Sequence, residues 1–138
     1  AKIWEGWRLG NLRPTFEPVL WFQKPYKIGG TIADNILQHG VGAYNQEAFL
    51  KYVDSPDNII SASFRRRESG LHPTQKPIDL MKCLIELTTQ ENQIVLDPFC
   101  GSGTTLVAAK ELNRQFIGME QDSNYYQISK DRLEYKLL

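Results

Sequence analysis

The chain has 138 residues, of which 41% are hydrophobic and 23% are charged, and its formal net charge at pH 7 is zero. This composition predicts one modest hydrophobic core, and the balanced charge excludes a global field that would draw the protein to nucleic acid or membrane. No apolar run approaches the roughly 20 residues of a membrane span and no signal-peptide pattern opens the chain, so we expect a cytoplasmic protein.

The first half of the chain predicts few regular elements. Residues 16–23 (FEPVLWFQ) are β-branched and aromatic enough for a strand. Thr31 is placed to cap a short helix, IADNILQ, that Gly40 would end. From there to about residue 71 turn-forming residues dominate, and they are interrupted by one candidate strand, NIISASF (residues 58–64).

The pattern becomes regular from residue 72 onward. Pro77 suits the first position of an amphipathic helix that runs to about Thr89. The elements expected after it are a buried strand QIVLD (93–97), a helix TTLVAAKEL (104–112), a second buried strand QFIGME (115–120) and a closing helix (123–138) capped by Ser123. This alternation of strands and helices is typical of a parallel, doubly wound α/β sheet.

The stretch LDPFCGSGTT (residues 96–105) places two glycines at the turn that leaves the first parallel strand. Ligands bind outside the carboxyl ends of such strands, and glycines let backbone N–H groups approach a ligand closely. An isolated Gly-x-Gly is also explained by a tight turn alone. The lysine of a phosphate-binding loop and the third glycine of a dinucleotide fingerprint are both missing.

Two acids accompany this turn. Asp97 precedes it, and Glu120 ends the next strand, where a carboxylate can accept hydrogen bonds from both hydroxyls of a ribose. The pattern therefore predicts a pocket for a nucleoside without a polyphosphate.

These motifs resemble those of the DNA amino-methyltransferases that use S-adenosyl-L-methionine. DPFCGSGTT is similar to their cofactor-binding motif, FIGMEQD to their ribose-contact motif, and HPTQKP (residues 72–77) to the segment that precedes these motifs in members with a rearranged motif order. EGWRLGNLRPTFEPVLWFQKPY and TIADNILQHGVGAYN look like the middle region of these enzymes. The resemblance implies a Rossmann-like α/β fold, incomplete in this chain and carrying an irregular inserted region.

The resemblance also implies an organisation and a set of cofactor contacts. Residues 1–45 would form a strand and helix region that precedes or enters the target-recognition region. Residues 46–71 would be an irregular segment that is a candidate for DNA contact, and residues 72–138 would bind S-adenosyl-L-methionine. The implied cofactor contacts are Thr74, Gln75, Lys76, Asp97, Pro98, Phe99, Gly101, Ser102, Gly103, Thr104, Thr105, Glu120 and Gln121. Among them, Asp97 would face the cofactor's ammonium group, Glu120 its ribose and Gln121 its adenine. The hydroxyls of Ser102, Thr104 and Thr105, at the helix start, would bind its carboxylate. Lys76 is also explained as a solvated surface charge.

One motif of these enzymes is missing. Their catalytic tetrapeptide, Asp/Asn/Ser-Pro-Pro-aromatic, accepts hydrogen bonds from the target amine and stacks on the flipped base, but this sequence has no two consecutive prolines. We therefore expect the C-terminal part of a longer enzyme, without catalytic residues of its own, that self-associates or pairs with the other half. The alternative is a non-catalytic remnant that binds the cofactor or DNA.

The remaining candidates are charged and metal-binding residues. Arg65, Arg66 and Arg67 are candidate contacts to DNA phosphates, although a run of arginines is also explained by a solvated loop. The two cysteines and two histidines show no metal-ligand spacing, and we expect both cysteines to be reduced.

Overall fold

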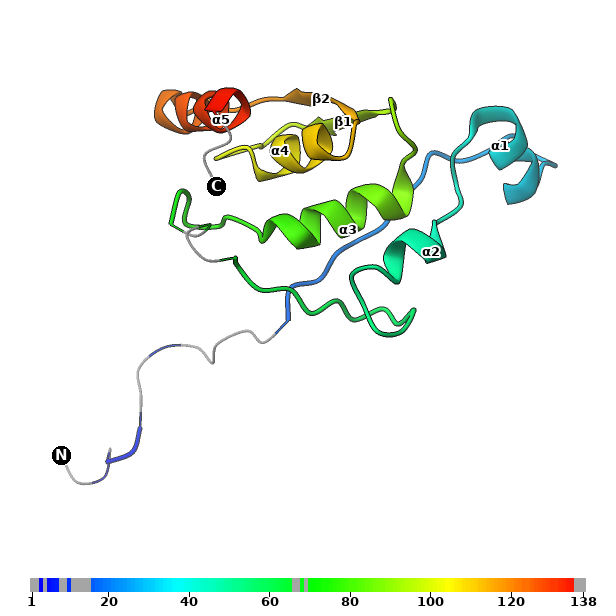
Figure 1. Ribbon diagram of the computed structural model, residues 1–138. Coiled ribbons are helices and arrows are strands. Elements are labelled where there is room, and N and C mark those ends of the chain that lie inside the picture. Colours follow the sequence, from blue (N-terminus) through cyan, green and yellow to red (C-terminus); the bar gives the residue numbers. More distant parts are fainter. Residues whose placement is uncertain are drawn as a thin grey trace.

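The computed structural model describes residues 16–65, 68 and 70–135, together with residues 3, 5–7 and 10 (Figure 1). Within these ranges the elements are α1 (Ile32–His39), α2 (Gln46–Phe49), α3 (Ile78–Thr88), β1 (Ile94–Asp97), α4 (Thr104–Glu111), β2 (Gln115–Gly118) and α5 (Ser123–Tyr135). None of the helices in this described part is long and apolar enough to span a membrane.

The two strands form a parallel pair joined by α4. Ile94 lies opposite Gln115, and Asp97 lies opposite Gly118 at the carboxyl end of both strands. Figure 1 shows α4 and then α3 stacked on one side of this pair, with α5 beside α4. This arrangement confirms the predicted strand–helix–strand unit, because a parallel connection needs a crossover helix.

The main core lies between the strands and the two central helices. Its buried residues are Ile78, Ile85, Val107, Ala108 and Ala109, and Val95 and Phe116 pack against it from the strands. Successive strand residues face opposite sides of a sheet, so the alternate residues of these strands point away from the helices. Ile94, Leu96 and Ile117, which we call the open face, are 59%, 57% and 49% exposed.

The ends of the described helices follow their sequence signals in part. Thr31 and Asp34 form a capping box on α1, and Gly40 ends the helix in the left-handed conformation, as predicted. Pro77 occupies the N-cap of α3 instead of its first helical position. The cap of α5 was predicted wrongly, because the Asp122 carboxylate, not Ser123, accepts hydrogen bonds from the N–H groups of residues 124 and 125, at 2.8 and 3.1 Å.

Both strands predicted in the first half of the chain are wrong. Residues 16–23 and 58–64 form neither helix nor strand. Aromatic and β-branched residues favour a pleated surface only where a neighbouring strand supplies hydrogen bonds, and neither segment pairs with another described segment. Side chains at residues 16 and 19–22 are accordingly exposed, although they are strongly apolar.

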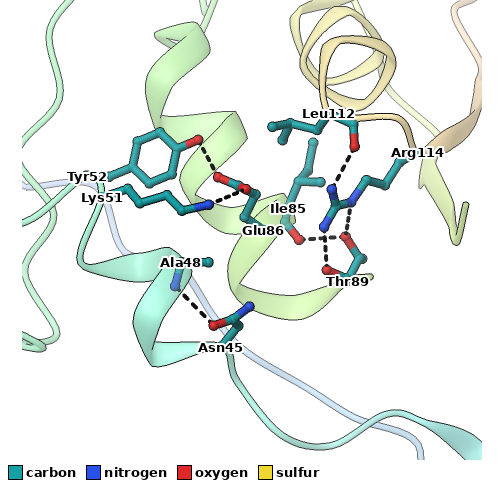
Figure 2. A network of polar contacts seen from close by, with 9 residues as sticks. All are labelled: Asn45, Ala48, Lys51, Tyr52, Ile85, Glu86, Thr89, Leu112 and Arg114. Atoms are coloured by element: carbon teal, nitrogen blue, oxygen red, sulfur yellow. Dashed lines mark hydrogen bonds and ion pairs between the residues drawn. The ribbon is translucent and has the colours of Figure 1, made fainter. Parts of the chain in front are cut away.

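The sequence did not predict the short helix α2, which contacts α3. Phe49, Cys83 and Leu87 form a second buried cluster, and Tyr52 packs at its edge. Figure 2 shows the polar contacts beside this cluster, where the Tyr52 hydroxyl donates to Glu86 at 2.6 Å. On the other side of α3, Arg114 donates to the carbonyl groups of Thr89 and Leu112, at 2.7 and 2.6 Å, and so joins the end of α3 to the end of α4.

Candidate functional site

The candidate site lies at the carboxyl ends of β1 and β2. Residues 98–103, which we call the glycine loop, connect β1 to α4. Met119 N–H donates to the carbonyl of Asp97, and Cys100 N–H donates to the carbonyl of Met119, both at 2.9 Å. These bonds continue the strand pairing beyond β2 and hold the glycine loop beside residues 119–122.

The two glycines are required by the backbone and by neighbouring side chains. Gly101 and Gly103 have φ values of +51° and +79°, in the left-handed region that L side chains rarely adopt. A Cβ atom on Gly101 would lie 3.3 Å from the His72 ring, and one on Gly103 would lie 2.8 Å from Cβ of Ser129. The absent side chains therefore make room for HPTQKP and for α5, an explanation that the sequence did not reveal.

Each of the two predicted acids is held by backbone N–H groups. The Glu120 carboxylate accepts from Gly101 N–H at 2.8 Å through one oxygen and from Asp122 N–H at 2.9 Å through the other. The Asp97 carboxylate accepts from Phe99 N–H at 3.1 Å. Because an ionised carboxylate has about four acceptor positions, both side chains keep capacity for a ligand.

The glycine loop and HPTQKP enclose a cavity of about 260 Å³, which we call the strand-end cavity. Nine predicted contacts line it, namely Thr74, Gln75, Lys76, Asp97, Phe99, Gly101, Ser102, Thr104 and Thr105. His72, Met81 and Cys100 also line it, whereas Pro98, Gly103, Glu120 and Gln121 do not. A larger hollow of about 590 Å³ lies among residues 23–42, but its one carboxylate, Asp34, already caps α1.

HPTQKP is held against the glycine loop by His72. Its ring lies 4.3 Å from the Tyr125 ring of α5, centroid to centroid, and its Nδ1 accepts from Thr74 N–H at 3.1 Å. The sequence analysis set His72 aside because no metal ligand accompanies it. Only the folded arrangement brings it over Gly101.

The other polar side chains of HPTQKP contact the protein itself. The Gln75 amide donates to the carbonyl of Glu68 at 2.5 Å and accepts from Leu71 N–H at 3.1 Å. Lys76 forms an ion pair with Glu17, so it is not an unpaired surface charge. Contact of Gln75 and Lys76 with the cofactor remains a prediction.

The segment of the arginine run that the structure describes is tied to α3. Arg65 forms an ion pair with Asp79, and the buried Glu68 carboxylate accepts from the N–H groups of Arg65 and Ile78. Arg66 and Arg67 lie outside the described residues. DNA contact by all three arginines remains a prediction.

Arg132 is a functional candidate that the sequence analysis missed. It lies on α5, is 4% exposed, and donates through Nη1 to the carbonyl of Ser102 at 2.7 Å and to Thr104 Oγ1 at 3.0 Å. Burial lowers the pKa of its guanidinium group. The available signal was its spacing, because Arg132 lies one turn after Ser129, which packs on Gly103.

Groups of both charge signs lie at or near the cavity. Burial raises the pKa of the Cys100 thiol, and the Asp97 and Glu120 carboxylates raise it further, which reflects negative charge at the strand ends. The N-terminus of α4 has no side-chain cap, so its first N–H groups present partial positive charge. The cavity is thus arranged to hold a ligand that carries both a cation and an anion.

A family model described as "DNA methylase" matches residues 5–131. The chain belongs to this family. "Type II methyltransferase M.HindIII" of Haemophilus influenzae is 53% identical over 135 residues, which cover 94% of this chain and 44% of that protein.

Two solved structures extend the comparison. The "M1.HpyAVI-SAM complex" is 40% identical with a TM-score of 0.55, over 67% of this chain and 44% of that one. The "PvuII DNA methyltransferase (cytosine-N4-specific)" is 22% identical with a TM-score of 0.60, over 70% of this chain and 37% of that one, and this likeness concerns the fold alone. The chain therefore spans less than half the length of these relatives. Membership of the DNA methylase family confirms the resemblance, and the structures confirm the predicted Rossmann-like α/β fold.

Proposed function

We propose that this chain is the cofactor-binding part of an enzyme that transfers a methyl group from S-adenosyl-L-methionine to an exocyclic amino group of adenine or cytosine in DNA. The observation that carries the proposal is the pair of carboxylates, Asp97 and Glu120, fixed by backbone N–H groups at the ends of neighbouring parallel strands. DNA methylation would place the protein where the DNA is, which is the cytoplasm in a bacterial cell.

The residues present suit the proposed cofactor. S-adenosyl-L-methionine carries a sulfonium and an ammonium group, which are attracted by the carboxylates that raise the Cys100 pKa. It also carries a carboxylate, which is attracted by the uncapped start of α4. When bound, the cofactor supplies the methyl group that is transferred.

The role of each residue follows from its position. Asp97 would hold the ammonium group, and Glu120 would accept hydrogen bonds from the ribose hydroxyls, with Gln121 beside the adenine. The hydroxyls of Ser102, Thr104 and Thr105 would donate to the carboxylate. The remaining proposed contacts are Thr74, Gln75, Lys76, Pro98, Phe99, Gly101 and Gly103.

Two further parts of the proposal concern partners. Arg65, Arg66 and Arg67 would contact DNA phosphates, which requires Arg65 to exchange Asp79 for a phosphate. A chain of these 138 residues would cover its open face by self-association.

A binding module without catalytic activity is the second candidate. It is favoured by the absence of any Pro-Pro pair from the sequence, because the family's amine-accepting tetrapeptide needs one. Transfer of a labelled methyl group to DNA by the full-length protein distinguishes the enzyme from this module.

Calorimetry with Glu120 variants of the full-length protein tests the cofactor site. We expect Glu120→Ala to weaken S-adenosyl-L-methionine binding by roughly 1.5 to 3 kcal/mol, because charge-assisted hydrogen bonds to the ribose are lost. The matched control is Glu91→Ala, which removes an exposed carboxylate just before β1, at the opposite end of the strand. Unchanged affinity in Glu120→Ala, or an equal loss in Glu91→Ala, would contradict the proposed site.

A further inference from the structure

The buried guanidinium group of Arg132 is not explained by packing alone. Its Nη1 atom donates to the carbonyl and the hydroxyl of Ser102, at 2.7 and 3.3 Å, and to the hydroxyl of Thr104 at 3.0 Å. Its Nε atom is buried and has no hydrogen-bond partner among the described residues. Arginine stays protonated in proteins, so α5 carries a positive charge beneath the start of α4.

Among the residues that the structure describes, this charge has only neutral hydrogen-bond partners. No described carboxylate forms an ion pair with Arg132, although Glu68 and Glu111 attract it from a greater distance. A buried charge without an ionic partner is costly, and for packing alone an apolar side chain of similar length is often as stabilising or better. The arrangement is therefore explained better by an anion that binds nearby than by packing.

The contacts of Arg132 also determine what the two hydroxyls can do. A hydroxyl group has one donor hydrogen and two acceptor lone pairs. Arg132 occupies a lone pair of Ser102 Oγ and one of Thr104 Oγ1, and neither hydroxyl has an acceptor for its own hydrogen among the described residues. Both residues line the strand-end cavity, so both hydrogens are available to a ligand there.

We propose that Arg132 is a positioning residue that holds the Ser102 and Thr104 hydroxyls as hydrogen-bond donors and thereby gives the strand-end cavity its preference for a carboxylate-bearing ligand. The inference rests on the proposed function, in which that carboxylate belongs to S-adenosyl-L-methionine. The uncapped N-terminus of α4 and the charge of Arg132 both attract this carboxylate. The contact of Arg132 with the ligand is indirect, through the two hydroxyls.

The test compares two ligands that differ only in the carboxylate. Binding of S-adenosyl-L-methionine and of its decarboxylated form is measured by calorimetry on the full-length protein and on Arg132→Met. We expect Arg132→Met to lower the affinity for S-adenosyl-L-methionine by about tenfold and that for the decarboxylated ligand by less than about twofold, because only the first loses charge-assisted hydrogen bonds. Arg132→Lys, which keeps the charge, should recover part of the difference.

A matched control separates this effect from a general loss of stability. Arg114→Met also removes an arginine that donates to backbone carbonyl groups, but Arg114 lies between α4 and β2, contacts Thr89 at the end of α3, and is absent from the cavity lining. It should lower the unfolding midpoint and leave the ratio of the two affinities unchanged. Equal losses for both ligands in Arg132→Met, or no loss, would overturn the inference.

A second variant keeps the test decisive where Arg132→Met does not fold. Ser102→Ala combined with Thr104→Val removes both hydroxyls and keeps Arg132, so the same selective loss is expected, and equal losses for the two ligands overturn the inference. A wild-type protein that binds both ligands equally well also overturns the inference, while the proposed function stands. A wild-type protein that binds neither ligand overturns the proposed function itself.

Discussion

Gly103 has a φ of +79° and directs its missing side chain at α5, where a Cβ atom would lie 2.8 Å from Cβ of Ser129. The glycine therefore has two separate roles. It adopts a left-handed backbone conformation at the N-cap of α4, and it lets α5 approach closely enough for Arg132 to reach Ser102. Gly40 has a similar φ of +68° but no heavy atom near its missing Cβ, so it has only the first role.

This pair of glycines gives a matched prediction. Gly40→Ala should destabilise the protein by about 1 kcal/mol, which is the cost of a left-handed alanine. Gly103→Ala should cost about 2 kcal/mol more, because α5 must also move. Urea unfolding of the full-length protein measures both costs, and equal values would show that α5 does not press on Gly103.

The residue scale also shows where sequence reasoning succeeds. The sequence places Asp97 and Glu120 at the ends of two predicted parallel strands. Because the carboxyl ends of parallel strands meet at one edge of a sheet, the sequence predicted that both acids lie next to the glycine turn. The roles of His72 and Arg132 were not predictable in this way. They depend on HPTQKP and α5 both packing on the glycine loop, and no local pattern encodes that contact.

At the scale of elements, α3 connects the irregular first half of the chain to the α/β unit. The Tyr52 hydroxyl and the Lys51 amine both donate to the Glu86 carboxylate on this helix, at 2.6 and 3.0 Å (Figure 2). Burial raises the pKa of Tyr52, and its hydrogen bond to Glu86 raises it further. Burial also raises the pKa of Glu86, but the hydrogen bonds from Tyr52 and Lys51 outweigh burial, so the pKa of Glu86 is lowered.

The contact between Tyr52 and Glu86 makes a prediction about stability and pH. Tyr52→Phe should lower the free energy of unfolding by about 1.5 kcal/mol at pH 7, because a hydrogen bond to a charged group is lost. Since the pKa of Tyr52 is higher in the folded protein, this stabilisation is complete below about pH 10, the ordinary tyrosine value, and is lost as the pH rises above it. Chemical unfolding at pH 7 and pH 11 measures the difference between the two proteins, which should shrink at the higher pH. A constant difference would contradict this assignment.

Elements also differ in how well the sequence predicts them. The helices α1, α3, α4 and α5 and both strands of the α/β unit were predicted to within a few residues, because their periodicity and caps are local signals. The strands predicted at residues 16–23 and 58–64 were wrong. A strand forms only beside a neighbouring strand. The sequence of a segment shows whether its side chains suit a strand, but not whether a neighbouring strand is present.

For the whole molecule, the notable feature is a parallel sheet that the described residues cover on one side only. The helices pack on the face that carries Val95 and Phe116, while the open face stays exposed. An apolar surface of this kind is rarely left exposed in a monomeric protein, and the chain spans 44% of the length of its Haemophilus relative. The length and charge of the chain gave no indication of this asymmetry, but the incomplete set of motifs did, because a sheet without its other strands exposes an apolar face.

The open face predicts the behaviour of a chain of these 138 residues alone. Sedimentation velocity should show species larger than a monomer, and the double variant Ile94→Lys, Ile117→Lys should shift them toward the monomer by charging that face. The control is Ile28→Lys, which charges an apolar side chain that is 99% exposed outside that face. A monomeric wild-type chain, or dissociation by the control variant as well, would contradict the prediction.

The ion pair between Lys76 and Glu17 joins two positions that are 59 residues apart in sequence. Both side chains are exposed, and an ion pair of this kind contributes at most about 1 kcal/mol and weakens as salt is added. Lys76 can therefore exchange Glu17 for another anion at little cost, whereas the glycine loop is fastened by the backbone hydrogen bond from Cys100 N–H to Met119. The Lys76 part of the cavity lining is thus adjustable and sensitive to ionic strength, and the glycine-loop part is held by backbone contacts.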